Sequence, residues 1–221
     1  MSIDQKTNVE RAATESVEFE AMDRSAFLLK GALATGALYG AAAIGPMVRA
    51  AFAQSDGNGG GGGGNSGDIE ILNFALTLEL LEADFYRQAL DQVDLGGELA
   101  SLAEEIGSSE EEHVDALSAT IQDLGGKPAK EPKFTFPLND EKSFLELAVT
   151  FEDTGVQAYN GAAPSLQSKE LLAVAGQIVQ IESRHAAAVR LEDGQQPVID
   201  AFDTTLSIDE VLEAVMPFIQ S

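Results

Sequence analysis

The chain has 221 residues, no cysteine, and 37 acidic against 13 basic side chains, for a formal net charge of −24. The lack of cysteine excludes disulfides, thiolate metal sites and dithiol redox chemistry, so a metal would have to be held by carboxylate, imidazole or water. The acidic surface, which we interpret as a solvated shell rather than a metal-gathering surface, repels nucleic acid and anionic lipid, and we expect neither as a partner.

Residues 1–53 have the organisation of an export signal peptide. A polar stretch, residues 1–26, leads into the segment RSAFLLK at 24–30, then into an apolar stretch rich in glycine and alanine, and finally into the A-x-A cleavage pattern AFA at 51–53. Because the apolar stretch is only weakly hydrophobic and a cleavage pattern follows it, we favour a cleaved signal over a lasting membrane span. The chain is therefore predicted to be exported, to the periplasm, the cell surface or the medium, with no stable membrane span after cleavage.

The segment at 24–30 resembles the twin-arginine export signal in its long polar leader and its R-x-x-F-L-x-K shape. Asp23 stands where that signal has its first arginine. The resemblance therefore supports export and leaves the export route open.

A glycine-rich linker separates this leader from the folded domain. Residues 54–67 consist of polar residues around a run of glycines, which form flexible chain and cannot build a core. The folded domain is predicted to begin near Asp68, where the aspartate would cap the first helix.

Four long stretches with helical periodicity follow, separated by short breaks at glycine and proline. They run from about Asp68 to Val93, from about Glu98 to Leu124, from after Asn139 to a fading end between Gly161 and Pro164, and from after Ser168 to near Gly194 and Pro197. The sequence SIDE at 207–210 is a capping box and predicts a short fifth helix. We therefore predict an all-α fold: a four-helix bundle over residues 68–194, followed by a C-terminal tail, residues 195–221, that contains the short helix.

The connection between the second and third helices differs from the others. Lys127 to Asn139 contains Pro128, Pro132 and Pro137, so this segment is predicted to be extended. At roughly 3.3 Å per residue it reaches about 40 Å, and the second helix, at about 1.5 Å per residue, is also about 40 Å long. The segment can therefore run the whole length of the bundle, as the long crossover connection of some four-helix bundles does.

The two histidines of the chain occur in the same local pattern. His113 and His185 each have a glutamate three positions earlier, Glu110 and Glu182. Positions i and i+3 project from one face of a helix, so a carboxylate and an imidazole can reach one metal together. One Glu-x-x-His pattern is weak evidence, whereas two on alternate helices indicate a metal site.

The other two helices share a second pattern. Glu79 is followed seven positions later by Tyr86, and Glu152 by Tyr159, so each tyrosine lies on the same helical face as its glutamate. The chain thus consists of two similar halves, each with a Glu/Tyr helix and a Glu-x-x-His helix. Each tyrosine could also be an ordinary residue at the edge of the core.

These glutamates and histidines are predicted to meet near the middle of the bundle. Four inward carboxylates would carry a formal charge of −4 into a dry core, which is costly unless cations neutralise it, and two divalent ions would do so. For any one of these residues alone, the default interpretation is a side chain that is hydrogen-bonded to a neighbour or partly exposed. Taken as a set, they favour a two-metal site.

These residues resemble those of the ferritin-like superfamily, in its bacterial and archaeal branch related to plant desiccation-associated proteins. The likeness is carried by LELLEADFY at 78–86 and IESRHAA at 181–187, with YNGAAP at 159–164 in support, and covers about residues 68–192. The resemblance implies two bound irons and ferroxidase, peroxidase or oxygenase activity. It also implies six ligands, with Glu110 and Glu182 bridging: Glu79, Glu110, His113, Glu152, Glu182 and His185.

Glu82 is an additional acidic residue that has no counterpart in the third helix, where Gly155 stands. In rubrerythrin-like relatives an extra carboxylate at this spacing exchanges as a ligand with redox state, so the resemblance implies that Glu82 is an alternative ligand or lies next to the ligands.

From the resemblance and the patterns together, we expect a site for two iron ions, with manganese as the other candidate. Oxidase- or peroxidase-type chemistry on O₂ or peroxide is expected there, with Tyr86 and Tyr159 supplying an electron or a hydrogen bond. The alternative is a non-catalytic protein with a structural or stress-protective role, for example in desiccation. A homodimer is compatible with the sequence.

Overall fold

The computed structural model describes residues 64–220. The predicted signal peptide, residues 1–53, and residues 54–63 of the predicted linker lie outside this range. Within it, no helix is long and apolar enough to cross a membrane.

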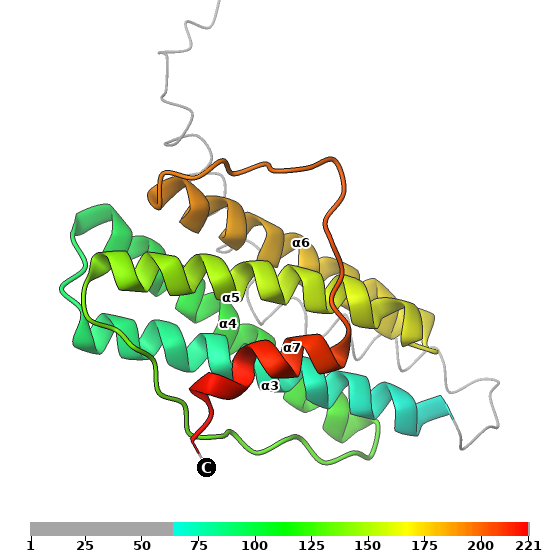
Figure 1. Ribbon diagram of the computed structural model, residues 1–221. Helices are drawn as coiled ribbons and strands as arrows, with labels where there is room; N and C mark the ends of the chain where they lie inside the picture. The colour runs from blue at the N-terminus through cyan, green and yellow to red at the C-terminus, as the bar shows by residue number, and fades with distance from the viewer. Residues whose placement is uncertain (1–63, 221) are drawn as a thin grey trace, which may run out of the picture.

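Four long helices and one short helix form an all-α bundle, as predicted (Figure 1). α3 packs chiefly against α4, and α5 chiefly against α6, while α7 packs on α5. Two 3-10 turns, η1 and η2, extend α5 and α7. The bounds are α3 (Gly64–Gln92), α4 (Gly97–Asp123), α5 (Glu141–Ala162), η1 (Ala163–Ser165), α6 (Lys169–Glu192), α7 (Ile208–Val215) and η2 (Met216–Phe218).

The first helix begins earlier than its sequence pattern predicts. α3 starts at Gly64, so Asp68 lies inside the helix and does not cap it. The buried Asp68 carboxylate instead accepts hydrogen bonds from the backbone N–H groups of Gln167, at 2.8 Å, and Ser168, at 3.0 Å. It thereby satisfies donors just before α6, a contact between residues about a hundred positions apart that local sequence rules do not reveal.

Side-chain caps begin α5, α6 and α7, whereas α4 begins after Gly96 without one. Asp140 and Ser143 form a capping box at the start of α5. Ser207 and Glu210 form the predicted capping box of α7. Each box satisfies two backbone donors that a helix terminus otherwise leaves unpaired.

The crossover between α4 and α5 runs along the bundle from one end to the other, as predicted (Figure 1). Phe134 and Phe136 point from it into the core. The C-terminal end pairs with it, because the N–H of Thr135 donates to the carbonyl of Phe218 at 2.9 Å and the N–H of Gln220 donates to the carbonyl of Lys133 at 2.8 Å. The tail therefore holds the crossover against the bundle.

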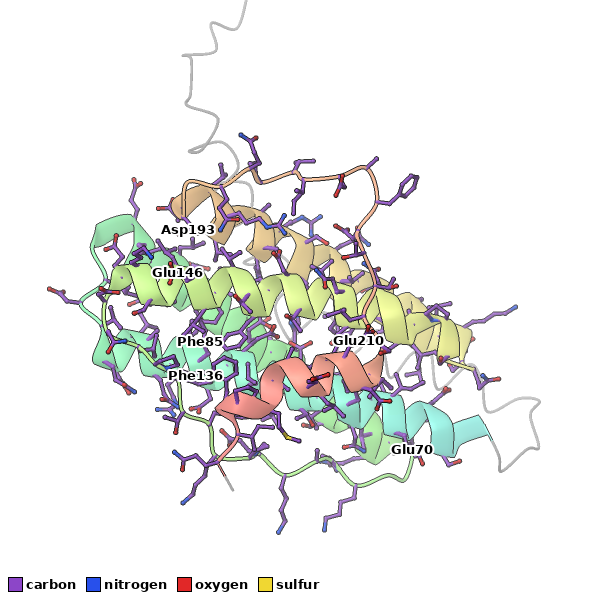
Figure 2. All side chains as sticks on the ribbon, viewed as in Figure 1. Glu70, Phe85, Phe136, Glu146, Asp193 and Glu210 are labelled. Atoms are coloured by element: carbon purple, nitrogen blue, oxygen red, sulfur yellow. The ribbon has the colours of Figure 1, made fainter. Side chains whose placement is uncertain are left out.

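Two apolar clusters fill the bundle, with the acidic and histidine residues between them. One contains the aromatic group around Phe85, whose ring centroid lies 5.3 Å from that of Phe136 and 4.9 Å from that of Phe151 (Figure 2). The other lies toward the N-terminal end of α3 and includes Leu76 and Ile121. These clusters keep water from the middle of the bundle.

The third helix ends at Ala162, within the stretch from Gly161 to Pro164 where its sequence pattern fades. Gly161 also allows the C-terminal segment to cross α5 closely. A Cβ atom at Gly161 would lie 1.9 Å from the carbonyl oxygen of Leu206. The N–H of Leu206 also donates to the carbonyl of Gln157 on the same helix, at 3.2 Å.

Gly161→Ala is expected to lower the free energy of unfolding by about 1–3 kcal/mol, because the added methyl group overpacks this contact. Urea unfolding measures the change, and protease cleavage within residues 195–207 should become faster. Gly176→Ala is the control, since a Cβ there meets no atom within 4 Å, and replacing a helical glycine by alanine is expected to add about 0.5–1 kcal/mol. Equal effects of the two substitutions would contradict this account of the close crossing.

Candidate metal centre

All four long helices contribute buried ionisable side chains to the middle of the bundle. Each of these residues is at most 4% exposed, and the four glutamates at positions 79, 110, 152 and 182 are completely buried. The helical repeat places them there, because each lies on the apolar face of its helix. They are Glu79 and Glu82 on α3, Glu110 and His113 on α4, Glu152 on α5, and Glu182 and His185 on α6.

Six of these residues form two overlapping groups, each of which could hold one metal ion. In each group, one ligand atom per residue lies within 4.8 Å of the others. Glu110 and Glu182 belong to both groups, so each half of the site has one glutamate and one histidine of its own and shares two glutamates. The groups are Glu79, Glu110, His113 and Glu182, and Glu110, Glu152, Glu182 and His185.

The Nδ1 atoms of both histidines face the carboxylates. His113 Nδ1 lies 3.1 Å from an oxygen of Glu79, 3.0 Å from one of Glu110 and 3.1 Å from one of Glu182. His185 Nδ1 lies 2.8 Å from Glu110 Oε1 and 3.6 Å from Glu152 Oε2. Glu110 therefore presents one oxygen to each histidine, the arrangement that a carboxylate shared by two cations requires.

Several atoms of this cluster have no hydrogen-bond partner among the described residues. They are Glu110 Oε1, Glu152 Oε2, both carboxylate oxygens of Glu182, and His185 Nδ1. Although His185 Nδ1 and Glu110 Oε1 are close, their orientation is not that of a hydrogen bond. Leaving buried polar atoms unpaired is costly, and bound cations would use these lone pairs. The residues present therefore fit a metal pair.

Each tyrosine hydroxyl donates a hydrogen bond to the glutamate of the opposite half. Tyr86 donates to Glu152 Oε1 at 2.5 Å, and Tyr159 donates to Glu79 Oε1. Burial, and then the charge of the bonded glutamate, raise the pKa of both tyrosines well above the ordinary value of 10.0. Both hydroxyls therefore stay protonated and remain donors.

The sequence profile of the ferritin-like domain matches residues 67–195, which include α4, α5, α6, all but the first three residues of α3, and every residue of the cluster. The chain belongs to the ferritin-like domain family. A comparison with curated proteins finds no significant match.

Burial and mutual repulsion shift the pKa values of the carboxyl groups in this ferritin-like domain. Burial, above all, raises the pKa of Glu79 to about 7. Burial followed by repulsion from Glu110 raises the pKa of Glu182 well above 4.5. Burial also opposes ionisation of Glu110, but the positive charges of His113 and His185 outweigh it and lower the pKa of Glu110. Protons therefore occupy the metal-free cluster, and metal binding has to release some of them.

Glu82 lies beside the two groups and belongs to neither of them. A Cβ atom at Gly155 would lie 3.0 Å from Glu82 Oε1 and 3.4 Å from Glu182 Oε2. The glycine at 155 thus leaves space beside α5 for the Glu82 carboxylate. The additional glutamate on α3 and the glycine at the matching position of α5 therefore fit together. Burial, and then repulsion from Glu182, raise the pKa of Glu82 well above 4.5.

Gly155→Ala is expected to push the Glu82 carboxylate aside while the protein keeps the metal content of the wild type, because the six other residues complete both groups. Elemental analysis of the loaded protein measures this. Glu82→Gln is the matched variant, since it removes the charge without adding a methyl group at 155. Loss of metal from both variants would make Glu82 a required ligand.

Sequence reasoning missed a layer of small residues next to Tyr159. Ala75, Ala116 and Ala162 line a cavity there together with the tyrosine ring. The sequence does contain a signal for this layer, because an alanine lies one helical turn from each of three predicted site residues. These alanines are four positions before Glu79, three after His113 and three after Tyr159. Alanine is common in helices, so this spacing alone does not indicate a cavity.

Proposed function

We propose that this ferritin-like domain binds two iron ions, or manganese ions, and uses them for oxidase- or peroxidase-type chemistry. The observation that carries the proposal is the pair of four-residue groups that share Glu110 and Glu182 and contain unpartnered buried ligand atoms. Glu79 and His113 would hold one ion, and Glu152 and His185 the other.

The chemistry of the donor set supports iron or manganese. Four carboxylates and two imidazoles are hard or intermediate ligands, and the chain has no thiolate to offer. Two Glu-x-x-His motifs with one further glutamate on each remaining helix are the ligand pattern of carboxylate-bridged di-iron and di-manganese bundles. A bound iron pair supplies electrons to O₂ or peroxide.

The residues around the cluster would position the ligands and keep the site dry. Tyr86 and Tyr159 each fix one carboxylate oxygen of a glutamate, which leaves the other oxygen of that glutamate directed at the histidine of its half. The hydroxyl of each tyrosine also holds a proton within hydrogen-bond distance of the cluster. The apolar clusters at both ends exclude water, which strengthens electrostatic interactions in the site.

We further propose that the protein is exported before it acts. The proposal is supported by the signal-like pattern of residues 1–53 and the glycine-rich linker after it. It places the metal centre in the periplasm, at the cell surface or in the medium.

The deciding experiment is to load the purified metal-free protein with Fe(II) under anaerobic conditions, remove excess metal, and measure iron per chain. About two irons per chain are expected. Consumption of O₂ and of hydrogen peroxide is then followed separately. A folded protein that takes up no iron or manganese would overturn the proposal. Metal uptake without turnover of either oxidant would favour the structural or stress-protective alternative.

A further inference from the structure

An apolar cavity of about 30 Å³ lies among the long helices, toward the end of the bundle where α3 begins and α5 ends. All four long helices line it, with Ala75, Ala116, Ala162 and Ala175 contributing one small side chain each. The partly exposed side chains of Ile71, Phe74 and Leu166 also line it.

The two polar side chains that line this cavity already have partners. The hydroxyl of Thr120 donates to the carbonyl of Ala116 at 2.7 Å, and the hydroxyl of Tyr159 donates to Glu79. No side-chain donor is therefore left to hold water or hydrogen peroxide. Cavities of this kind stay dry and accept apolar guests, whereas a polar guest loses its hydrogen bonds to water.

The size of the cavity restricts the guest further. At about 30 Å³ the cavity is much smaller than an apolar protein cavity of roughly 150 Å³ that holds benzene, so it suits a guest smaller than a benzene ring. The guest is therefore a small apolar molecule, and dioxygen has this size and polarity.

The cavity borders one half of the metal centre. Tyr159 forms part of the cavity wall with its ring and reaches Glu79 with its hydroxyl. Tyr86, the corresponding residue of the other half, is packed against Phe85, at a centroid distance of 5.1 Å, and Phe144, at 5.9 Å. A Cβ at Gly107 would lie 3.0 Å from Tyr86 Cβ, so the chain packs closely on that tyrosine. The two halves, which are similar in sequence, therefore differ in access.

We propose that this cavity is a binding site for a small apolar molecule, and that dioxygen uses it to reach the Glu79 and His113 half of the metal centre past Tyr159. The route to the metals rests on the proposed function, whereas binding in the cavity does not. Dioxygen, rather than peroxide, is then the oxidant that the protein admits by this path.

Xenon is the probe for the cavity, because it is apolar and small, and the test uses the full-length metal-free protein. For the wild type, the ¹²⁹Xe chemical shift is expected to change in a saturable way as the protein concentration rises. Ala175→Leu, which fills the cavity from α6, should abolish it. Ala100→Leu is the matched control at a half-buried alanine against the other apolar cluster, and it should keep the shift. Ala162→Val serves if Ala175→Leu fails to fold.

Loss of xenon binding in the cavity-filling variant alone supports the site. No saturable binding to the wild type, or equal binding to Ala175→Leu and Ala100→Leu, overturns it. Because this experiment needs no metal, its result is separate from whether the protein binds iron.

The second measurement tests the route in iron-loaded protein. Ala175→Leu should slow the initial consumption of dioxygen by about tenfold, while the rate with hydrogen peroxide and the iron content stay at wild-type values. Equal dioxygen rates in wild type and variant would overturn the route. A protein that takes up no iron would contradict the proposed function and leave the xenon result intact.

Discussion

Replacing either shared glutamate by glutamine is expected to remove both metal ions, whereas replacing an unshared glutamate should remove only one. Glu110 and Glu182 belong to both four-residue groups. A variant at either position would therefore leave each ion with one charged ligand fewer, and the two ions with one shared carboxylate instead of two. Glu79 or Glu152, in contrast, belongs to one group only.

The measurement is iron per chain after anaerobic loading and removal of excess metal. About two irons are expected for the wild type, about one for Glu79→Gln or Glu152→Gln, and close to none for Glu110→Gln or Glu182→Gln. Glu111→Gln is the control, because Glu111 is exposed and adjacent to Glu110 on the same helix, and it should keep both ions. Equal losses in shared and unshared variants would contradict the shared arrangement.

The fold could be predicted from the sequence because its main signals are local and periodic. Helical repeats, the capping box of α7, and a crossover with three prolines each act within a few residues. The Glu-x-x-His motifs are local as well, since their spacing fixes one helical face. These signals determine which faces turn inward, and four inward faces of similar length meet at one level.

The tyrosine contacts show what local reasoning cannot give. Tyr86 shares a helical face with Glu79, but two turns separate them by roughly 11 Å along the axis, which is too far for a hydrogen bond. Its hydroxyl reaches Glu152 on α5 instead. The partner of each tyrosine thus depends on how the two halves pack, which the sequence of either half does not specify.

Other differences between the sequence predictions and the structure also arise from contacts between distant segments. Asp68 was predicted to cap its own helix and instead serves backbone donors before α6. Gly161 lies next to the predicted helix end, but the room that it makes for Leu206 could not be predicted. The cavity beside Tyr159 depends on the summed volumes of side chains from four helices. Each feature is a contact between segments far apart in the chain, and periodicity carries no information about such contacts.

Without metal, the Glu182→Gln variant is expected to be at least as stable as the wild type, whereas with iron it should be less stable. In the metal-free protein, both Glu182 oxygens are buried without hydrogen-bond partners. Burial, and then repulsion from Glu110 and Glu79, raise the pKa of Glu182. A carboxyl group whose pKa is higher in the folded than in the unfolded state destabilises the fold once the pH exceeds its ordinary value of 4.5.

Removing that charge should therefore leave the metal-free variant at least as stable as the metal-free wild type at neutral pH. Its advantage should grow as the pH rises above 4.5 and disappear below it. Glutamine has nearly the volume of glutamate, so the substitution leaves no cavity that would obscure the effect. Glu111→Gln, at the exposed neighbouring position, should melt like the wild type in both conditions.

Iron changes the comparison, because metal that binds only the folded state stabilises it by mass action. The gain is about 4 kcal/mol at a free metal concentration a thousand times the dissociation constant. The wild type should receive this gain, and Glu182→Gln should receive little of it, since the variant has lost a ligand of both positions. Thermal melts of both proteins with and without iron measure the difference. If glutamine at 182 destabilises the protein equally in both conditions, Glu182 stabilises the fold as a structural residue, and the shared metal site loses its central support.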